Sequence, residues 1–196
     1  MKSTNTTKRS TKSITEVEFV KLIDGVRQNK IIRENTRVNM LRTYVILYYT
    51  GLRLGEVREL RIKNIKELIE TGTTKIILSK TSKERELYIT ENFKKELKKL
   101  FDFNIEEDEN WIICKGSDKK TRPGSLGYIS MINKNLKEIL GEEFTSHSFR
   151  KGFITEMFSK GLSIEMIRKC SGHSNTNTTL SDLKPTFIDI KNCLVR

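Results

Sequence analysis

The stretch VNMLRTYVILYYTGLRLGE, residues 38–56, decides the fold of this chain. Residues 38–50 leave little polar surface on any side of a helix, a pattern that is typical of a helix buried on all faces. Gly51 follows directly and is expected to end that helix, and Gly55-Glu56-Val57 begins another short helical turn. The stretch therefore predicts a buried helix that a core can surround.

On the N-terminal side of this helix the character of the sequence changes twice. Residues 1–13 are Ser, Thr, Asn, Lys and Arg with almost no apolar content, so we expect a flexible basic tail or linker. Thr15 and Glu18 have the spacing of a capping box, which predicts that the first helix begins there. A length of 196 residues fits one sizeable core. We therefore expect a single domain over residues 14–196.

On the C-terminal side, β-prone runs at residues 75–78 and 86–89 flank the basic segment SKTSKER, residues 79–85. This arrangement predicts an antiparallel hairpin. Apolar residues between 93 and 101 recur at helical spacing. An acidic loop (residues 104–110), a short strand (residues 111–113), a basic loop (residues 115–127) and two or three further helices are expected to follow. The predicted fold class is mainly α with a small antiparallel β-sheet.

The charge of the chain limits the class of binding partner it favours. Lys and Arg total 37 against 25 Asp and Glu, which gives a net charge of +12 and a pI of about 9.6. This balance favours a polyanion, although charge alone does not separate nucleic-acid binders from other basic proteins. No run approaches the roughly 18 apolar residues of a membrane span, and no signal peptide is visible. We expect an intracellular protein.

The cysteines point to no metal or disulfide. Cys114, Cys170 and Cys193 are odd in number, widely spaced and without a Cys-x-x-Cys pair. Such spacing suggests neither a disulfide framework nor a structural zinc site. We expect inert thiols, no metal and no other cofactor.

Two arginines are the first candidates for chemistry. Cleaving a DNA phosphodiester without a metal requires cations that neutralise the nonbridging oxygens. A guanidinium stays charged and its planar fork matches phosphate, so Arg53 and Arg150 are candidates for a phosphate clamp. Glu56 follows Arg53 by three residues and is placed to orient it. A single arginine is more often a surface ion pair, so the clamp depends on the wider set of residues.

Both histidines of the chain fall in motifs of this set. His147 precedes Arg150 by three residues at the start of a helix predicted near Ser146. Its imidazole is suited to accept a proton or to donate a hydrogen bond beside a phosphate. His173 follows the Gly172 turn and is a candidate second donor. Either histidine alone would more often be structural, and their combination with Arg53 makes the pattern specific.

The ordered set Gly-Leu-Arg-x-x-Glu, His-x-x-Arg and Gly-His resembles the catalytic domain of the tyrosine recombinases, the phage integrase family. The resemblance runs from about Ser13 to the C-terminus. It implies a mainly helical domain with a small antiparallel sheet. It also implies cleavage of one DNA strand at a time through a 3′-phosphotyrosyl bond, and rejoining without ATP or an obligatory metal. The implied assembly is a tetramer on two double-stranded DNA duplexes. The helical N-terminal domain of most members is absent from this chain, which predicts a truncated or minimal member.

The same resemblance points to the hairpin for a general acid. The family places its catalytic lysine in a Gly-Lys-Gly-x-Lys-x-Arg-like turn, which residues 79–85 resemble with both glycines replaced. The match selects Lys80, with Lys83 as second choice, to protonate the leaving 5′-oxygen; an ordinary phosphate contact is the alternative. The DNA-contacting residues expected here and in the basic loop are Lys83, Arg85, Lys119, Lys120 and Arg122.

The resemblance fails at the nucleophile. The segment TTLSDL, residues 178–183, resembles Thr-Thr-x-x-Tyr-x, with Asp182 in the tyrosine position nine residues after His173. No tyrosine follows Tyr128. Aspartate is shorter than tyrosine and its charge repels a phosphate, so we expect no stable covalent DNA complex. Ser181 is an outside candidate for the nucleophile. Whether Asp182 is natural or introduced stays open.

The C-terminal segment carries an apolar stripe. Pro185 suits the first turn of a helix, and Phe187, Ile190 and Leu194 share one face of it. In the family this helix docks into a neighbouring protomer and links activity to assembly. The alternative is that it folds back onto its own core.

Three functions remain in view. The leading interpretation is a site-specific recombinase or integrase that lacks its nucleophile. A type IB topoisomerase or telomere resolvase would use the same clamp. A DNA-binding module that kept the clamp and lost catalysis is the non-enzymatic alternative. Base readout needs contacts that a single sequence does not reveal, so the target DNA and the source of the chain stay open.

Overall fold

The structure is a computed structural model that describes residues 11–77, 84–116 and 118–183. Its elements, in chain order, are α1 (Glu16–Gln28), α2 (Glu34–Thr50), α3 (Leu54–Val57), α4 (Ile62–Thr71), β1 (Thr73–Ile77), β2 (Glu84–Tyr88), α5 (Glu91–Leu100), α6 (Ser125–Leu140), α7 (Ser146–Ser159), α8 (Ile164–Ser171) and α9 (Thr176–Asp182). The fold is mainly helical with one two-stranded antiparallel sheet in the described ranges. This confirms the predicted fold class.

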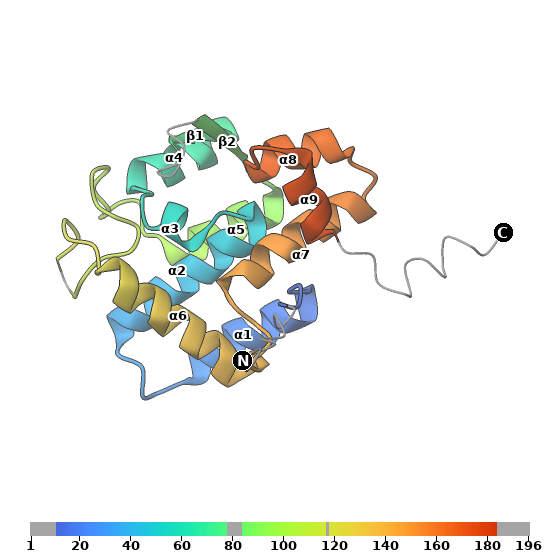
Figure 1. Ribbon diagram of the computed structural model, residues 1–196. Helices are drawn as coiled ribbons and strands as arrows, with labels where there is room; N and C mark the ends of the chain where they lie inside the picture. Colours follow the sequence, from blue (N-terminus) through green and yellow to red (C-terminus); the bar gives the residue numbers. More distant parts are fainter. Residues whose placement is uncertain (1–10, 78–83, 117, 184–196) are drawn as a thin grey trace, which may run out of the picture.

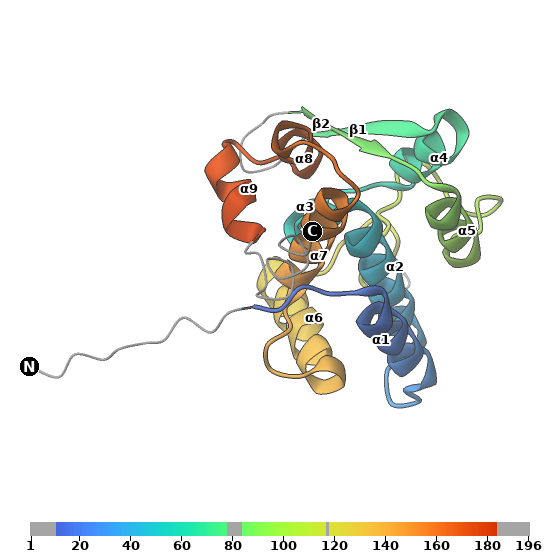
Figure 2. The same cartoon turned by 90° about the vertical axis from the view of Figure 1, so that its right-hand side faces the viewer.

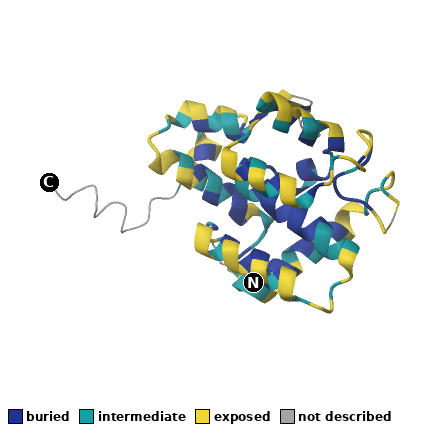
Figure 3. Cartoon of the chain, turned by 180° about the vertical axis from the view of Figure 1, so that it is seen from behind, coloured by how far each residue is buried: buried dark blue, intermediate teal, exposed yellow. Residues whose placement is uncertain are grey.

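Helix α2 is the centre of the molecule. It begins at Glu34, earlier than the expected residue 38, and ends at Thr50, where Gly51 takes a left-handed conformation with φ 58°. Helices α1, α5 and α7 all pack against it, and Figure 1 shows α2 crossing the middle of the fold. From behind, the buried residues gather on these central helices (Figure 3). Residues 39–47 of the helix are buried on every side, as the sequence predicts for its central part.

Helix α1 covers one side of α2. The capping box at its start is present, with the Thr15 backbone N–H donating to Glu18 Oε2 at 2.9 Å. Phe19 faces inward and stacks on Tyr48 of α2, with ring centroids 3.9 Å apart. The predicted first helix is therefore confirmed together with the reason for its start.

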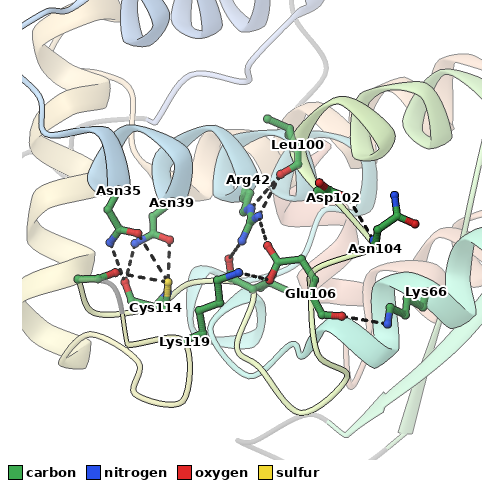
Figure 4. A network of polar contacts seen from close by, with 12 residues as sticks. Asn35, Asn39, Arg42, Lys66, Leu100, Asp102, Asn104, Glu106, Cys114 and Lys119 are labelled. Atoms are coloured by element: carbon green, nitrogen blue, oxygen red, sulfur yellow. Dashed lines mark hydrogen bonds and ion pairs between the residues drawn. The ribbon is translucent and has the colours of Figure 1, made fainter.

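Polar side chains of α2 hold the long segment between α5 and α6. Arg42 pairs with the buried Glu106, with Nη2 and Oε1 2.8 Å apart, and also donates to the carbonyl of Ile112. One turn earlier, Asn39 Nδ2 donates to the carbonyl of Cys114 at 2.7 Å. Figure 4 shows these contacts side by side along α2. Buried polar groups satisfied in this way fasten an irregular segment without a sheet.

That segment differs from one expectation. Residues 111–113 form no strand, and the pairing there is a single bridge between Arg61 and Trp111. Ile112 and Ile113 are fully buried, so their β-prone character reflects burial in the core. Helix α4 was not expected, although Ile62, Ile65 and Leu68 have helical spacing and face the core.

The predicted hairpin is present. Strands β1 and β2 pair antiparallel, with Thr73 opposite Tyr88 and Ile77 opposite Glu84. Residues of β2 alternate between exposed and buried, and the two buried ones are Arg85 and Leu87. The tip, residues 78–83, lies outside the described residues. An arginine at an inward position of a strand has to find partners inside the protein.

Helix α7 packs against α2, and helices α8 and α9 pack against α7 and against each other. Helix α7 begins at Ser146, as expected, and contacts α2, α6, α8 and α9, while α8 lies beside β2. Figure 2 shows α8 beside the hairpin and α9 next to α8. The described helices include none with the length and apolarity that a bilayer crossing requires. The expected helix after Pro185 lies outside the described residues.

Candidate functional site

Arg150 is the most deeply buried member of the predicted set, with 1% of its surface exposed. Its Nη1 donates to the Gly51 carbonyl at 2.9 Å, Nη2 donates to the Ser171 carbonyl, and Nε donates to His173 Nε2 at 3.0 Å. Burial and the nearby charges of Arg53 and Arg85 lower its pKa to about 9. The guanidinium therefore stays charged at neutral pH, with two of its five N–H groups left over.

His173 is locked by its neighbours. Nε2 accepts from Arg150, and Nδ1 lies 2.9 Å from Thr179 Oγ1. Since Nε2 carries no hydrogen in this arrangement, Nδ1 is protonated and donates to the threonine. Burial, then the charges of Arg150 and Arg53, lower the pKa of His173 to about 3. His173 is thus neutral, and donation from Nε2 to a phosphate would require Arg150 to release that nitrogen.

Asp182, at the last residue of α9, reaches the same point. Its Oδ2 lies 3.6 Å from His173 Nε2 and is buried without a hydrogen-bond partner among the described residues. A neutral imidazole whose Nε2 accepts a hydrogen bond offers this oxygen neither a positive charge nor a hydrogen. The residue in the tyrosine position therefore faces the clamp with one oxygen, Oδ2, that has no hydrogen-bond partner among the described residues.

Arg53 and Glu56 are paired as predicted. Arg53 is the N-cap residue of α3; its backbone N–H donates to Glu56 Oε2 at 2.7 Å and its Nη1 lies 2.9 Å from Oε1. Glu56 is buried, whereas the side chain of Arg53 is 38% exposed. The Glu56 carboxylate binds Arg53 on the side that faces the protein. The other side of the Arg53 guanidinium stays open to solvent.

Arg85 corrects the sequence interpretation. It was expected to contact DNA, but it is 4% exposed and points inward from β2. Its Nη2 donates to the Thr50 carbonyl at 2.5 Å, and Nη1 lies 3.6 Å from Glu56 Oε2. Burial lowers its pKa to about 10 against the opposing effect of Glu56. The prediction was wrong because the alternation of β2 directs this side chain into the core.

His147 lies in the first turn of α7 and remains exposed. Partial loss of hydration lowers its pKa; Asp182 opposes this effect, while Arg150 and Arg53 add to it. These mutual influences place His147 in the same electrostatic cluster as the clamp. A lowered pKa keeps its imidazole neutral near pH 7, the form that can accept a proton.

Two of the three cations predicted in the basic loop already form ion pairs within the protein. Lys119 Nζ lies 3.2 Å from the buried Glu106 (Figure 4), and Arg122 pairs with Glu59 and stacks on Trp111, with its guanidinium carbon 4.7 Å from the ring centre. Lys120 is exposed. Of the three loop cations proposed for DNA contact, Lys120 is the most exposed, and the partly exposed Lys119 and Arg122 already have carboxylate partners. Lys80 and Lys83 lie outside the described residues.

The structure adds partners that the motifs did not single out. Thr179 fixes the tautomer of His173, and the carbonyls of Thr50, Gly51 and Ser171 receive the buried arginines. Thr179 belongs to the Thr-Thr pair of the motif, which was the available signal. A backbone carbonyl leaves no signal in a sequence.

The cluster as a whole is short of negative charge. Among the described residues, Arg53, Arg85 and Arg150 face two carboxylates, those of Glu56 and Asp182, while His173 is neutral. A cavity of about 690 Å³ between α1, β2 and α7 reaches Arg85 from the other side, and its lining includes neither Arg53 nor Arg150. Within the described ranges, no three His, Cys, Asp or Glu residues group as a metal site would require. The arrangement is suited to receive an anion from the Arg53 side.

The model of the Phage integrase family matches residues 12–182. Among curated proteins, the tyrosine recombinase XerA of Pyrococcus furiosus is 28% identical over 185 residues, which cover 94% of this chain and 61% of that protein. The chain thus spans about three-fifths of the length of this relative.

Solved structures share the fold. A crystal structure of XerA recombinase superposes with a TM-score of 0.72 at 20% identity, over 94% of this chain and 64% of the other. The XerH site-specific recombinase, in a post-cleavage complex with a palindromic difH substrate, gives a TM-score of 0.68 at 19% identity, over 92% of this chain and 51% of the other. At these identities the likeness concerns the fold.

Proposed function

The chain belongs to the phage integrase family, and on that premise we propose that it is the DNA-cleaving domain of a site-specific recombinase or integrase whose nucleophile is replaced by Asp182. Its substrate in this proposal is double-stranded DNA. The reaction of its active relatives would cleave and rejoin strands through a 3′-phosphotyrosyl intermediate. This chain, as it stands, would bind DNA without forming that bond.

One observation carries the proposal. Side chains from the α2–α3 junction, α7, the turn after α8 and the end of α9 converge on one cationic cluster: Arg53, His147, Arg150, His173 and Asp182. These residues are far apart in sequence and include both histidines of the chain. Perturbed pKa values with specific charged partners are typical of functional sites.

The geometry divides the proposed work among these residues. Arg53 faces solvent and is placed to meet a phosphate first. Arg150 supplies a second, buried positive charge. Its attraction for the phosphate grows when bound DNA excludes water from the site. His147, neutral near pH 7, would accept the proton of an attacking hydroxyl. His173 orients Arg150 through Nε2, which is a narrower role than phosphate donation.

Asp182 affects this chemistry in two ways. It lacks a hydroxyl that could attack phosphorus and leave a stable ester, since an acyl phosphate would be labile. Its carboxylate also cancels one of the positive charges that a phosphate would otherwise meet. Both effects support the proposal that the unmodified chain is inactive.

The test is covalent trapping. The Asp182→Tyr protein is incubated with nicked duplexes drawn from DNA flanking its own gene, denatured, and compared on a gel with the unmodified chain. Asp182→Phe is the matched control, because it restores the ring without the hydroxyl. We expect an SDS-resistant DNA adduct with the tyrosine variant alone.

The other outcomes are equally informative. An adduct formed by the unmodified chain would contradict the proposed inactivity. No adduct with Asp182→Tyr, despite folded protein and salt-sensitive DNA binding, would favour the second candidate function, a DNA-binding module that kept the clamp without catalysis. The aspartate in the tyrosine position, which offers no hydroxyl for attack on phosphorus, is the observation that favours this second candidate.

Assembly follows from the same proposal. We propose that the chain forms a tetramer on DNA inside the cell, with the C-terminal segment linking protomers. The XerH relative was solved bound to its difH DNA substrate, which supports DNA as the partner. The apolar stripe at residues 187–194 supports a role in protein contact.

A further inference from the structure

Arg85 has no part in the proposed chemistry, yet it is one of the two buried residues of β2 and the only charged one of that pair. Its side chain is 2% exposed and touches two parts of the site. One is the Thr50 carbonyl at the end of α2, and the other is the carboxylate of Glu56. The 3.6 Å separation from Glu56 is too long for a hydrogen bond, so that contact is a charge interaction.

Glu56 is shared between two arginines. Oε1 receives Arg53 Nη1, while Oε2 receives the Arg53 backbone N–H and faces Arg85 Nη1. If Arg53 were the sole cation near this buried carboxylate, the pair would be neutral and would attract a phosphate weakly. With Arg85 behind Glu56, one positive charge remains on the exposed side. The buried arginine therefore leaves the charge of Arg53 available for phosphate.

The end of α2 joins the two halves of the clamp. The carbonyl of Thr50 receives Arg85, and the next carbonyl, that of Gly51, receives Arg150. Both carbonyls lie at the negative end of the helix, where cations are favoured. Strand β2 and helix α7 are thereby held to adjacent peptide groups, so the position of Arg85 is tied to that of Arg150.

We propose that Arg85 is a positioning residue for phosphodiester cleavage: it compensates Glu56 and aligns the end of α2, so that Arg53 presents an uncompensated charge to the phosphate. It acts through Glu56 and touches no DNA. This inference rests on the proposed recombinase function. It replaces the expectation that Arg85 contacts DNA directly.

The chain contains a matched control. Arg42 is also a buried arginine beside a buried glutamate, Glu106, and a second cation, Lys119, faces that glutamate too. Replacing Arg42 by methionine also removes a buried arginine beside a buried glutamate, in the middle of α2 and without touching Arg53 or Glu56. It therefore reports the general cost of losing a buried arginine.

The experiment compares Arg85→Met, Arg85→Lys and Arg42→Met in the Asp182→Tyr protein, with rates of covalent DNA complex formation measured on equal amounts of folded protein. We expect Arg85→Met to slow the reaction on the order of 10- to 100-fold. Arg85→Lys keeps the charge and should recover much of the rate, and Arg42→Met should stay within about 2-fold. DNA affinity should change little in all three, because neither arginine contacts DNA.

A second readout does not depend on cleavage. The Arg53 side-chain Nε–H signal, assigned by its loss in Arg53→Lys, is recorded by NMR in the chain with Asp182 in place. We expect it to shift in Arg85→Met and to stay in place in Arg42→Met. A rate in Arg85→Met equal to that of Arg42→Met, or an unmoved Arg53 signal, would overturn the inference. If Asp182→Tyr forms no adduct, the recombinase proposal fails and the NMR signal still decides the role of Arg85.

Discussion

His173 Nε2 lies 3.6 Å from Asp182 Oδ2, and the two side chains nevertheless form no ion pair at neutral pH. The reason is burial together with Arg150, whose Nε donates to the same imidazole nitrogen; burial first and then the charge of Arg150 lower the pKa of His173 to about 3. The histidine is held neutral between a cation and an anion. Its protonation would break the contact with Arg150 and create one with Asp182.

The first prediction concerns acid stability. The folded pKa of His173 lies below its unfolded value of about 6.5, so its contribution to stability is complete above that pH and is lost as pH falls toward 3. Between pH 6.5 and 5 the loss should be about 2 kcal/mol. Urea unfolding across this range checks it, with His173→Gln as the control that removes the titrating group. Parallel curves for the two proteins would show that His173 is not held neutral.

The second prediction separates the two clamp arginines. Removing Arg150 leaves the Gly51 and Ser171 carbonyls and the His173 ring without their donor. Arg150→Ala should therefore lower the free energy of unfolding by on the order of 3 to 5 kcal/mol. Arg53→Ala, at a half-exposed side chain, should lower it by about 1 kcal/mol or less. Denaturant titration measures both, and equal losses would contradict the burial difference.

The clamp should contribute little to the long-range attraction between the protein and DNA. In the Asp182→Tyr protein, Arg53→Ala should abolish covalent complex formation while most salt-dependent DNA affinity remains, because the charge of +12 is spread over the chain. Binding and trapping are measured on the same duplex. A collapse of affinity in Arg53→Ala would mean that the clamp also dominates binding.

The third prediction concerns the basic loop. Lys120 is exposed, whereas Lys119 is already paired with Glu106. Lys120→Gln should reduce the slope of log affinity against log salt by about 1, the value for one lost phosphate contact. Lys119→Gln should change the slope less. Fluorescence anisotropy at several salt concentrations distinguishes them, and a larger effect at Lys119 would show that its ion pair opens on DNA.

The fourth prediction concerns the segment that crosses α7. The backbone N–H of Ile14 donates to the Ser148 carbonyl at 3.1 Å, and a Cβ at Gly152 would lie 2.2 Å from the Ile14 carbonyl oxygen. Gly152→Ala should displace residues 11–14 from α7 and destabilise the protein by about 1 to 3 kcal/mol. Gly127→Ala on α6 meets no atom within 4 Å and should be neutral or stabilising. A thermal melt of each variant provides the check, and a harmless Gly152→Ala would mean that the segment moves freely.

The fifth prediction tests the proposed assembly. A chain that ends at Leu183 lacks the apolar stripe of residues 187–194. Bound to DNA, it should remain a single copy per site where the full chain forms multimers, because the proposed link between protomers is gone. Mass photometry on duplexes with two sites measures the copy number. An unchanged copy number would show that the stripe packs against the core of its own chain instead of linking protomers.

Much of the fold was accessible from the sequence because its signals are local. The Thr15–Glu18 capping box, the Gly51 stop and the two β-prone runs that mark the hairpin each depend on neighbouring residues, and each is present. Residues 111–113 were misread because the requirement for burial also selects β-prone side chains.

The candidate site was accessible only in part. The ordered motifs brought together Arg53, His147, Arg150, His173 and Asp182, and the structure places them in one cluster. The motifs could not show which way each side chain points. The register of β2 turns Arg85 inward, and Arg150 donates a hydrogen bond to His173 Nε2. Both outcomes depend on partners distant in sequence.

Gly51 determines how freely this site can vary. Its φ is positive, an added Cβ would lie 2.5 Å from the Phe153 ring, and its carbonyl holds Arg150. A library of variants selected for folding alone would therefore return glycine here, as would one selected for strand cleavage. At Arg53, two residues later, the same two selections would diverge. Comparing the tolerated residues at these neighbouring positions would separate what the scaffold demands from what the chemistry demands.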